Sequence, residues 1–217
     1  LCVVKEDMKE SIWFLRKKKP VFIRICFMIA GLNLFLSSMI TIGIPVIIVE
    51  RLSMADQLLG VTQGLLAVGG MIGGLFTVVF AKKLRPGKAW IFLLLCAFSA
   101  CVMGAGMLLA EQLRFLKYLI LSGTGLLVMV FSTMFSIQML AVVQTQTPAE
   151  LTGKVVACIM AFIMCAQPAG QLLYGLLFER ISVETPFIMV GTGAVSFFIA
   201  LYAKKILKEL GGEEDNA

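Results

Sequence analysis

The residues of this chain that are best placed to do chemistry are uncharged amides and hydroxyls inside long apolar stretches. A buried amide raises the free energy of a folded chain unless a hydrogen-bonding partner compensates it. These groups are therefore expected to face a neighbouring helix or a cavity. The candidates for lining a solute cavity are Asn33, Thr41, Gln63, Gln138, Gln167 and Gln171. Asn33 is the strongest candidate because it is the most central in its stretch. Interhelical hydrogen bonding is the alternative for each residue, and the sequence leaves both open.

Acid–base and metal chemistry have few possible residues here. The chain has 13 Asp and Glu residues and no His, and all 13 carboxylates lie outside the long uncharged stretches. The six cysteines show no metal-ligand spacing, so we interpret them as small apolar core residues. General acid–base catalysis and metal binding mostly use His or carboxylates. We therefore expect no catalytic residue, no metal and no cofactor, and we do not expect an enzyme.

The apolar residues are gathered into stretches long enough to cross a bilayer. A helix needs about 20 residues to span a hydrocarbon core of about 30 Å. The predicted spans cover about 21–49, 57–81, 89–110, 118–143, 155–178 and 185–203. They form a bundle over 21–205, with a cytoplasmic interfacial linker over 1–20 before it and a cytoplasmic tail over 206–217 after it. Between the fourth and fifth spans we expect a loop from Gln144 to Pro148, and we expect Lys154 to lie in the same connecting segment. After Leu210 we expect disorder.

These stretches predict an all-α integral membrane protein rather than either alternative for apolar sequence. Charged residues make up only 15% of the chain, whereas a soluble domain has about a quarter. The strands of a membrane β-barrel alternate apolar and polar residues over about ten positions, but these stretches are continuously apolar. Six buried helices of a soluble protein in succession are the other alternative, and so long a series makes it improbable.

The basic residues are concentrated on one side of the predicted spans. With the N-terminus inside, 15 of the 19 Lys and Arg residues lie in inside segments and the other four lie outside. Basic residues favour the cytoplasmic side of a membrane, so we expect a multi-pass protein of the cell (inner) membrane with both termini in the cytoplasm. One inside loop carries the basic residues Lys82, Lys83, Arg85 and Lys88. We interpret the basic groups as anchors near the lipid bilayer, and we do not expect nucleic acid to bind.

Glycine and proline residues mark possible contacts and bends between the helices. Small residues four apart, such as Gly69 and Gly73, let helix backbones approach closely in lipid. A proline inside a helix removes a backbone donor and favours a kink. The predicted packing and hinge residues are Pro45, Gly64, Gly69, Gly70, Gly73, Gly74, Pro168 and Gly170. For the glycines, a static contact and a sliding contact both remain open.

The two halves of the chain share a short sequence pattern. The segment from Gly73 to Leu84 aligns without a gap with the segment from Gly170 to Ile181. Each has a glycine, an apolar run, a charged pair and an aliphatic residue. The second and fifth spans are three spans apart, so they run in opposite directions through a membrane. This is the arrangement of inverted-topology repeats, and it predicts that the six helices form two inverted three-helix repeats.

Three stretches of the chain occur in an order that resembles a known family. They are Asp7–Leu15 followed by Pro20, then Val49–Gly60, and then Gln144–Val155. Together they resemble the C-terminal half of major facilitator superfamily transporters, most closely the macrolide-efflux and siderophore-exporter permeases. The stretches are similar to the end of that family's central cytoplasmic loop, its turn into the eighth helix, and its loop between the tenth and eleventh helices. The chain departs from the family in the loop after Gly74, which has basic residues but no acidic one.

The resemblance implies a fold, partners and an activity. The chain would be half of a 12-helix fold and would pack, around a central cavity, against an N-terminal six-helix half of the same protein that precedes Leu1. Rocking of the two halves would export amphiphilic small molecules, drug-like or macrolide-like, with a proton as the coupling ion. No phosphate-binding loop occurs in the sequence, so an ion gradient is the expected energy source. The alternatives are a permease for another substrate, a siderophore or a metabolite, and a non-transporting six-helix scaffold subunit.

Overall fold

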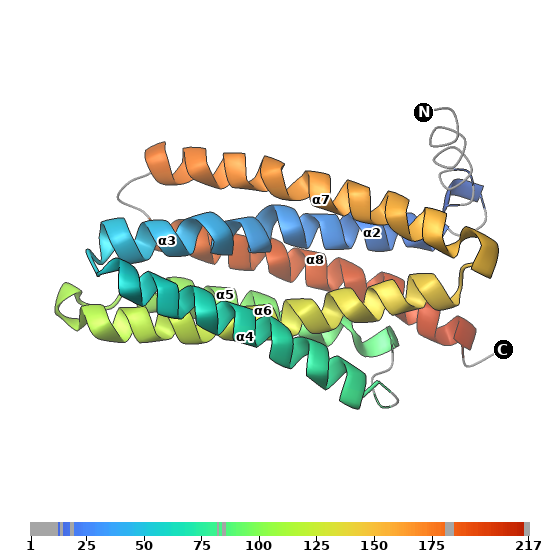
Figure 1. The fold of residues 1–217 in the computed structure, drawn as a ribbon, viewed down its shortest axis with the longest axis horizontal. Helices are drawn as coiled ribbons and strands as arrows, with labels where there is room; N and C mark the ends of the chain where they lie inside the picture. Colours follow the sequence, from blue (N-terminus) through green and yellow to red (C-terminus); the bar gives the residue numbers. More distant parts are fainter. Residues whose placement is uncertain are drawn as a thin grey trace.

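The computed structural model describes residues 13, 15–17, 20–81, 83, 86–180 and 185–214, with side chains as far as residue 207 except those of residues 111 and 185. In this part of the chain every regular element is a helix, and six helices are long and apolar enough to cross a membrane. They lie side by side along the long axis of the molecule (Figure 1). The predicted all-helical class and the six apolar helices are therefore confirmed.

The first of the six, called the first span, covers Pro20–Arg51. It consists of α2 (Pro20–Leu32), η1 (Asn33–Ser37), η2 (Met39–Gly43), α3 (Ile44–Val46) and η3 (Ile47–Arg51). The others are α4 (Asp56–Val79), α5 (Trp90–Met107, preceded by the one-turn η4, Pro86–Lys88), α6 (Arg114–Thr145, preceded by η5, Glu111–Leu113), α7 (Ala149–Arg180) and α8 (Thr185–Glu214). The end at which the first span begins is called the proximal end, and the opposite end the distal end.

Several helices are longer than the predicted spans. α6 ends at Thr145 and α7 begins at Ala149, so the expected loop from Gln144 shrinks to 146–148. Lys154, expected in a loop, lies in the second turn of α7. α8 continues to Glu214, which corrects the expectation of disorder after Leu210. A helix satisfies its own backbone hydrogen bonds, so it continues past the last apolar residue until a different backbone arrangement is more stable.

The predicted linker over 1–20 is described only at Trp13, 15–17 and Pro20. Trp13 and 15–17 are helical. Trp13 is exposed, whereas Leu15 is buried against the hydrophobic core. The rest of the linker lies outside the described residues, so its interfacial role stays a prediction.

The helices form close pairs, two of which are parallel. α4 packs along α6, and α7 packs along the first span, while α5 packs against both α6 and α8. Figure 1 shows that α4 and α6 run from the distal to the proximal end, whereas the first span and α7 run the other way. Fully buried side chains such as Phe22, Leu93 and Phe135 fill the core between these pairs. The arrangement leaves α4 and α7 with the smallest buried shares of the six helices.

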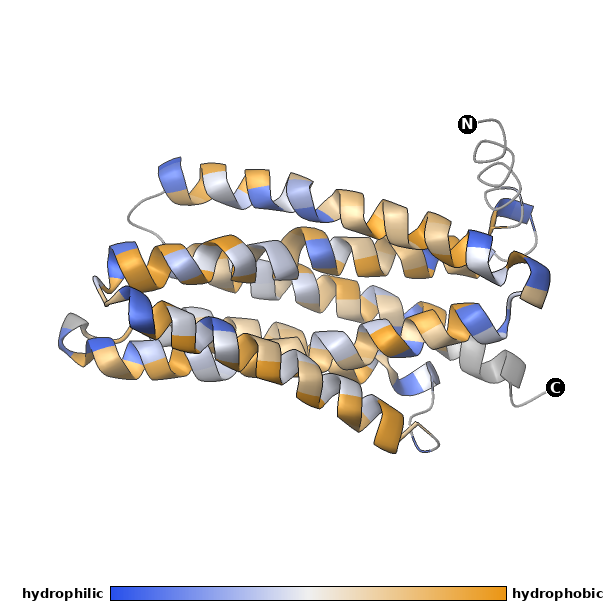
Figure 2. Ribbon diagram, viewed as in Figure 1, coloured by the Kyte–Doolittle hydropathy of each residue, from blue (hydrophilic) through white to orange (hydrophobic). Residues whose placement is uncertain are grey.

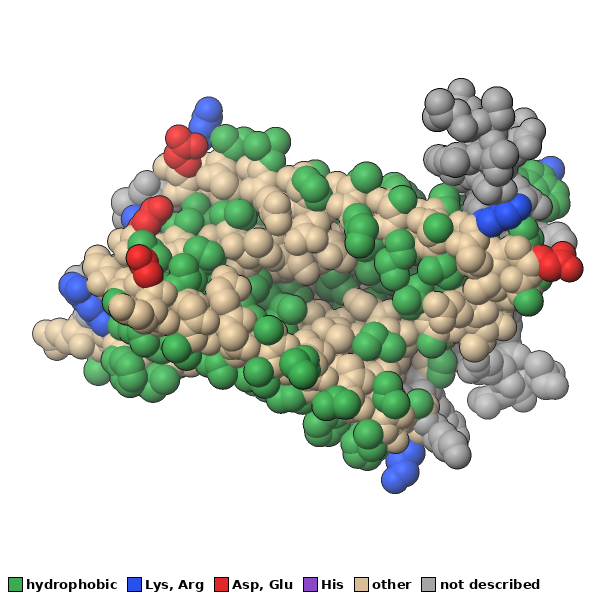
Figure 3. All heavy atoms as spheres, viewed as in Figure 1, with side chains coloured by type: hydrophobic (Ala, Val, Ile, Leu, Met, Phe, Trp, Pro, Cys, Tyr) green, Lys and Arg blue, Asp and Glu red, His purple; other side chains and the backbone are tan. Residues whose placement is uncertain are grey.

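The outer surface is apolar along the length of the bundle. Met71, Phe98 and Leu172 are each 68% exposed. Figure 2 shows hydrophobic residues along the helices, and Figure 3 shows the charged side chains of this face confined to its ends. Water disfavours so large an apolar surface, whereas the hydrocarbon of a bilayer accommodates it. The chain is therefore a multi-pass membrane protein.

The first span changes its winding at Asn33. From that residue most of the helix has the wider π-helical pattern. Pro45 lies in the three-residue α3. The residues on either side of α3, Gly43 and Ile47, keep helical backbone angles. Proline cannot donate an α-helical hydrogen bond, and π-type turns supply another hydrogen-bonding pattern. The helix thus continues through Pro45, whose role as a hinge stays a prediction.

Candidate functional site

Asn33 and Thr41 both bond within the first span. Asn33 is half-buried, and its Nδ2 donates to the carbonyl oxygen of Ile29 at 3.0 Å. Thr41 is exposed, and its Oγ1 donates to the carbonyl oxygen of Ser37 at 2.8 Å. Such local bonds satisfy a polar side chain in an apolar helix.

Ser38 lies at the contact between the first span and α7. It is fully buried. Its Oγ is 2.8 Å from the carbonyl oxygen of Asn33 and 3.0 Å from that of Gln167 in α7. This hydroxyl therefore connects the strongest predicted candidate to another predicted residue through their backbones. Ser38 is not among the predicted site residues, because it adjoins Ser37 and the sequence does not indicate which of the two serines faces a neighbouring helix.

Gln167 and Gln171 are half-buried in α7. They are four residues apart, and the spacing places them on the face of α7 that carries Tyr174. The Tyr174 hydroxyl lies 2.6 Å from Thr192 Oγ1 of α8, which itself donates to the carbonyl oxygen of Ile188. Tyr174 is therefore the donor to Thr192. The two glutamines therefore share a face of α7 with Tyr174, whose hydroxyl bonds to α8.

Gln63 and Gln138 lie on the other parallel pair. Gln63 is exposed on α4. Gln138 of α6 is buried, and neither its Nε2 nor its Oε1 has a partner among the described residues. An unpaired buried amide costs about 1–3 kcal/mol, so Gln138 is the least satisfied predicted residue. No hydrogen bond among the described residues joins Gln63 or Gln138 to the cluster around Ser38.

Two of the predicted glycines form the closest contact between α4 and α6. A Cβ atom on Gly69 would lie 2.7 Å from the carbonyl oxygen of Leu126, and one on Gly73 would lie 2.5 Å from that of Val130. Side-chain bonds extend the same contact toward the distal end, where Thr62 Oγ1 lies 2.8 Å from Ser122 Oγ. Only glycine allows the two backbones to approach this closely.

The other glycines of α4 are not close contacts. A Cβ atom on Gly70 or Gly74 would make ordinary van der Waals contact, at 3.8 Å from Thr133 and 3.9 Å from Ile137. Around Gly64 there is open space within 4 Å. These three residues therefore do not set the distance between α4 and its neighbours within this chain, although their spacing resembles that of Gly69 and Gly73.

Gly170 forms the corresponding close contact between α7 and the first span. A Cβ atom there would collide with the carbonyl oxygen of Leu34 and with Ser38 Oγ. Pro168, two residues earlier, lies inside the helix and is exposed. At the distal end, Phe178 packs against Gly43 of the first span. Gly170 is thus a packing residue, while the hinge role of Pro168 stays a prediction.

The contact between α5 and α8 contains glycines that the sequence reading missed. A Cβ atom on Gly104 would lie 2.7 Å from Val190, and one on Gly193 would lie 2.5 Å from Cys101. Small residues at positions 97, 101 and 104 recur at helical spacing in α5, and this pattern was the available signal.

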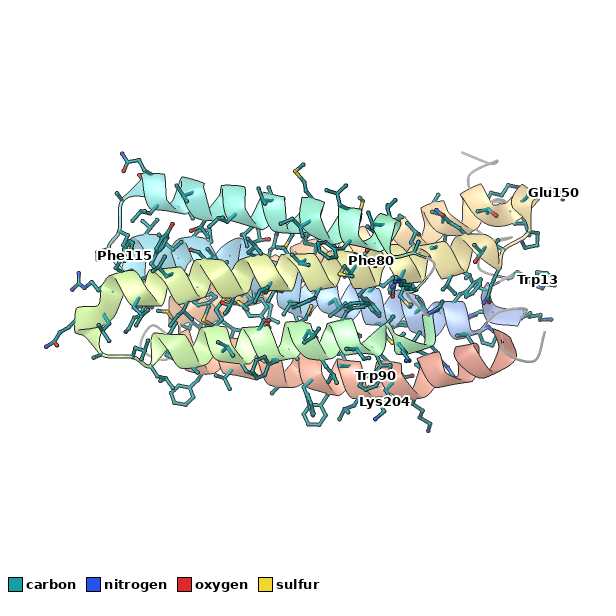
Figure 4. The ribbon with its side chains drawn as sticks, turned by 90° about the horizontal axis from the view of Figure 1, so that it is seen from below. Trp13, Phe80, Trp90, Phe115, Glu150 and Lys204 are labelled. Atoms are coloured by element: carbon teal, nitrogen blue, oxygen red, sulfur yellow. The ribbon has the colours of Figure 1, made fainter. Side chains whose placement is uncertain are left out.

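Two residues of the predicted basic loop are described at the proximal end. Lys83 and Lys88 are exposed, whereas Lys82 and Arg85 lie outside the described residues. Lys204 of α8 places its Nζ 4.7 Å from the centroid of the Trp90 ring of α5. Figure 4 labels the two side chains next to each other, where α5 and α8 run side by side. A cation over an aromatic ring is attracted by its negative face, so this pair connects α5 and α8.

The described residues contain no group of three or more His, Cys, Asp or Glu that could hold a metal ion, and their five cysteines are free thiols. The carboxylates of Glu50, Glu150 and Glu179 belong to long helices, but each is within two residues of a helix end. Figure 3 shows the face formed by α7, the first span, α6 and α4, which is hollowed along its middle and carries no charged side chain there. Comparisons with protein-family models, with curated proteins and with solved structures find no match for this chain.

Proposed function

We propose that this chain is half of a secondary active transporter that exports amphiphilic small molecules by alternating access. The observation that carries the proposal is the pair of glycine contacts at Gly73 and Gly170. These residues occupy the same position in the two aligned sequence segments. Each meets the backbone carbonyl of a parallel neighbour, Val130 in α6 and Leu34 in the first span.

The pairing of whole helices supports the same arrangement. Two inverted three-helix repeats would match the first span with α6, α4 with α7, and α5 with α8. When the repeats are superimposed, the contact between α4 and α6 would match the contact between α7 and the first span. The contact between α5 and α8 would match itself, because each of these helices is the counterpart of the other. These are close pairs of the bundle, together with the pair of α5 and α6, which would correspond to the contact of α8 with the first span. Inverted repeats that pack in this way are the framework of many secondary transporters.

The exposure of α4 and α7 supports a partner that covers one face of the bundle. α4 and α7 flank the hollowed, uncharged face and are the least buried helices. A second six-helix half, which in the major facilitator superfamily is the N-terminal half of the same protein, would cover that face and close a central cavity. The open glycine Gly64 on α4 leaves room for a close helix approach from outside this chain.

The side chains inside the spans favour an uncharged or weakly polar amphiphile. The buried amide of Gln138 has no partner among the described residues, the amides of Gln167 and Gln171 are half-buried, and the surrounding surface is apolar. The carboxylates lie at helix ends, so the proton that we propose as coupling ion would titrate a group of the other half. The basic residues at the proximal end support a cytoplasmic location for that end, in the cell membrane.

Transport by the full-length protein in sealed vesicles tests the proposal. We expect efflux of fluorescent amphiphilic dyes that stops when an uncoupler collapses the proton gradient. We expect Gly170→Ala to slow transport per folded protein by about tenfold or more, because a Cβ atom there displaces α7 by forcing a rearrangement worth about 1–3 kcal/mol. Gly175→Ala is the matched control, because Gly175 lies in the same helix with nothing within 4 Å.

The outcomes separate the alternatives. Uptake or efflux of siderophores or metabolites, with no movement of dyes, would contradict the proposed substrate class but would support the transporter function. No gradient-dependent movement of any compound in a broad panel, by a protein that is folded in the vesicles, would overturn the proposal in favour of a scaffold subunit.

A further inference from the structure

The Ser38 hydroxyl has one proton and two acceptors. The carbonyl oxygen of Asn33 lies 2.8 Å away in its own helix, and the carbonyl oxygen of Gln167 lies 3.0 Å away in α7. A hydroxyl donates one hydrogen bond at a time. The bond within the first span and the bond to α7 are therefore alternatives of nearly equal length.

Both acceptors have another donor. The backbone N–H of Ser38 itself also points to the Asn33 carbonyl, and the carbonyl of Gln167 lies within the continuous helix α7, where it accepts from the backbone four residues on. The group that needs a partner is therefore the buried hydroxyl. An unpaired buried hydroxyl would lower the stability of the fold by about 1–3 kcal/mol. Because the Asn33 carbonyl lies in the same helix, the hydroxyl keeps a partner whether or not α7 is in contact.

We propose that Ser38 is a positioning residue that holds α7 against the first span and releases it without leaving a buried hydroxyl unpaired. When α7 is seated, with Gly170 against Leu34, the proton is shared with Gln167. When α7 moves away, the same proton turns to Asn33. Pro168 lies beside this bond and lacks a backbone N–H, so α7 is held less firmly by its own backbone there. This inference goes beyond the proposed function, since it concerns the motion of α7 and no substrate.

Hydrogen–deuterium exchange of the full-length protein in lipid vesicles tests the proposal without any transport measurement. We expect Ser38→Ala to speed exchange in α7 around Gln167–Gly170 by about two- to tenfold, the effect of losing one hydrogen bond. We expect Ser38→Cys, of similar size but a weaker donor, to give an intermediate rate. Thr41→Ala is the matched control, because Thr41 also donates to a carbonyl of the first span but has no acceptor on α7.

The comparison decides between a positioning role and a merely structural one. Faster exchange in α7 for Ser38→Ala and Ser38→Cys, with α7 unchanged in Thr41→Ala, supports the proposal. Equal exchange of α7 in all three variants would overturn it, as would an increase confined to the first span. If Ser38→Ala does not fold, the near-isosteric Ser38→Cys against Thr41→Ala gives the same decision.

Discussion

At the scale of single residues, the glycines of α4 differ in their surroundings although their spacing is alike. Gly73 faces a backbone carbonyl that cannot move aside, whereas Gly64 faces open space. An alanine substitution therefore changes a different contribution to the free energy of unfolding at each of the two positions. At Gly73 it adds a steric collision, and at Gly64 it adds only the better helix propensity of alanine.

We expect Gly73→Ala and Gly64→Ala to change stability in opposite directions. Gly73→Ala should lower the free energy of unfolding by about 1–3 kcal/mol, because the new Cβ atom would lie 2.5 Å from the carbonyl oxygen of Val130. Gly64→Ala should raise it by up to about 1 kcal/mol for this chain by itself, in which nothing lies within 4 Å of Gly64. Unfolding in detergent, followed by far-ultraviolet circular dichroism, measures both. Equal effects of the two substitutions would show that α4 does not pack on α6 through Gly73.

At the scale of elements, the bundle is a set of helix pairs joined by few polar bonds. α4 and α6 share the bond between Thr62 and Ser122, and α7 and α8 share the one between Tyr174 and Thr192. Bonds of this kind contribute about 0.6 kcal/mol each in a membrane bundle. Close backbone packing at the glycines therefore determines most of the positions of the helices, and the polar bonds adjust them.

The pair of α5 and α8 offers a test at this scale. We expect Lys204→Gln to lower stability by about 0.5–1 kcal/mol, because it removes the cation from the face of Trp90. Lys205→Gln is the matched control, since Lys205 is exposed in the next position. Thermal unfolding in lipid vesicles compares them. If the two variants unfold at the same temperature, the ring contact does not hold α8 to α5.

At the scale of the whole molecule, the orientation in the membrane is open to a direct experiment. We expect a membrane-impermeant maleimide applied to cells to label Gln112→Cys and to leave Glu150→Cys unlabelled. Both positions are exposed. Gln112 belongs to η5, which joins α5 to α6 at the distal end (Figure 1), and Glu150 lies at the proximal end (Figure 4). The basic residues favour a cytoplasmic proximal end. The signal is measured as the increase over the unsubstituted protein. The reverse labelling would contradict the predicted orientation.

The six helices and their class could be predicted from the sequence, because crossing a bilayer depends on the local length and apolarity of each stretch. Their ends could not, since helices such as α7 continue into polar residues. Of the glycines expected to act in packing or as hinges, Gly69, Gly73 and Gly170 lie against backbone carbonyls of neighbouring helices, whereas Gly64 has no neighbour within 4 Å in this chain.

Only the tertiary structure decided which of these residues meet. Gly64 and Gly73 have the same small-residue spacing, and Ser38 and Thr41 have the same chemistry. What differs is the neighbour that each one faces, and this depends on the crossing of helices that are far apart in the sequence. Ser38 reaches the carbonyl oxygen of Gln167, 129 residues away, because Gly170 lets the backbones of α7 and the first span approach. The sequence by itself determined that six apolar helices form; the long-range packing decided which polar atoms lie between them.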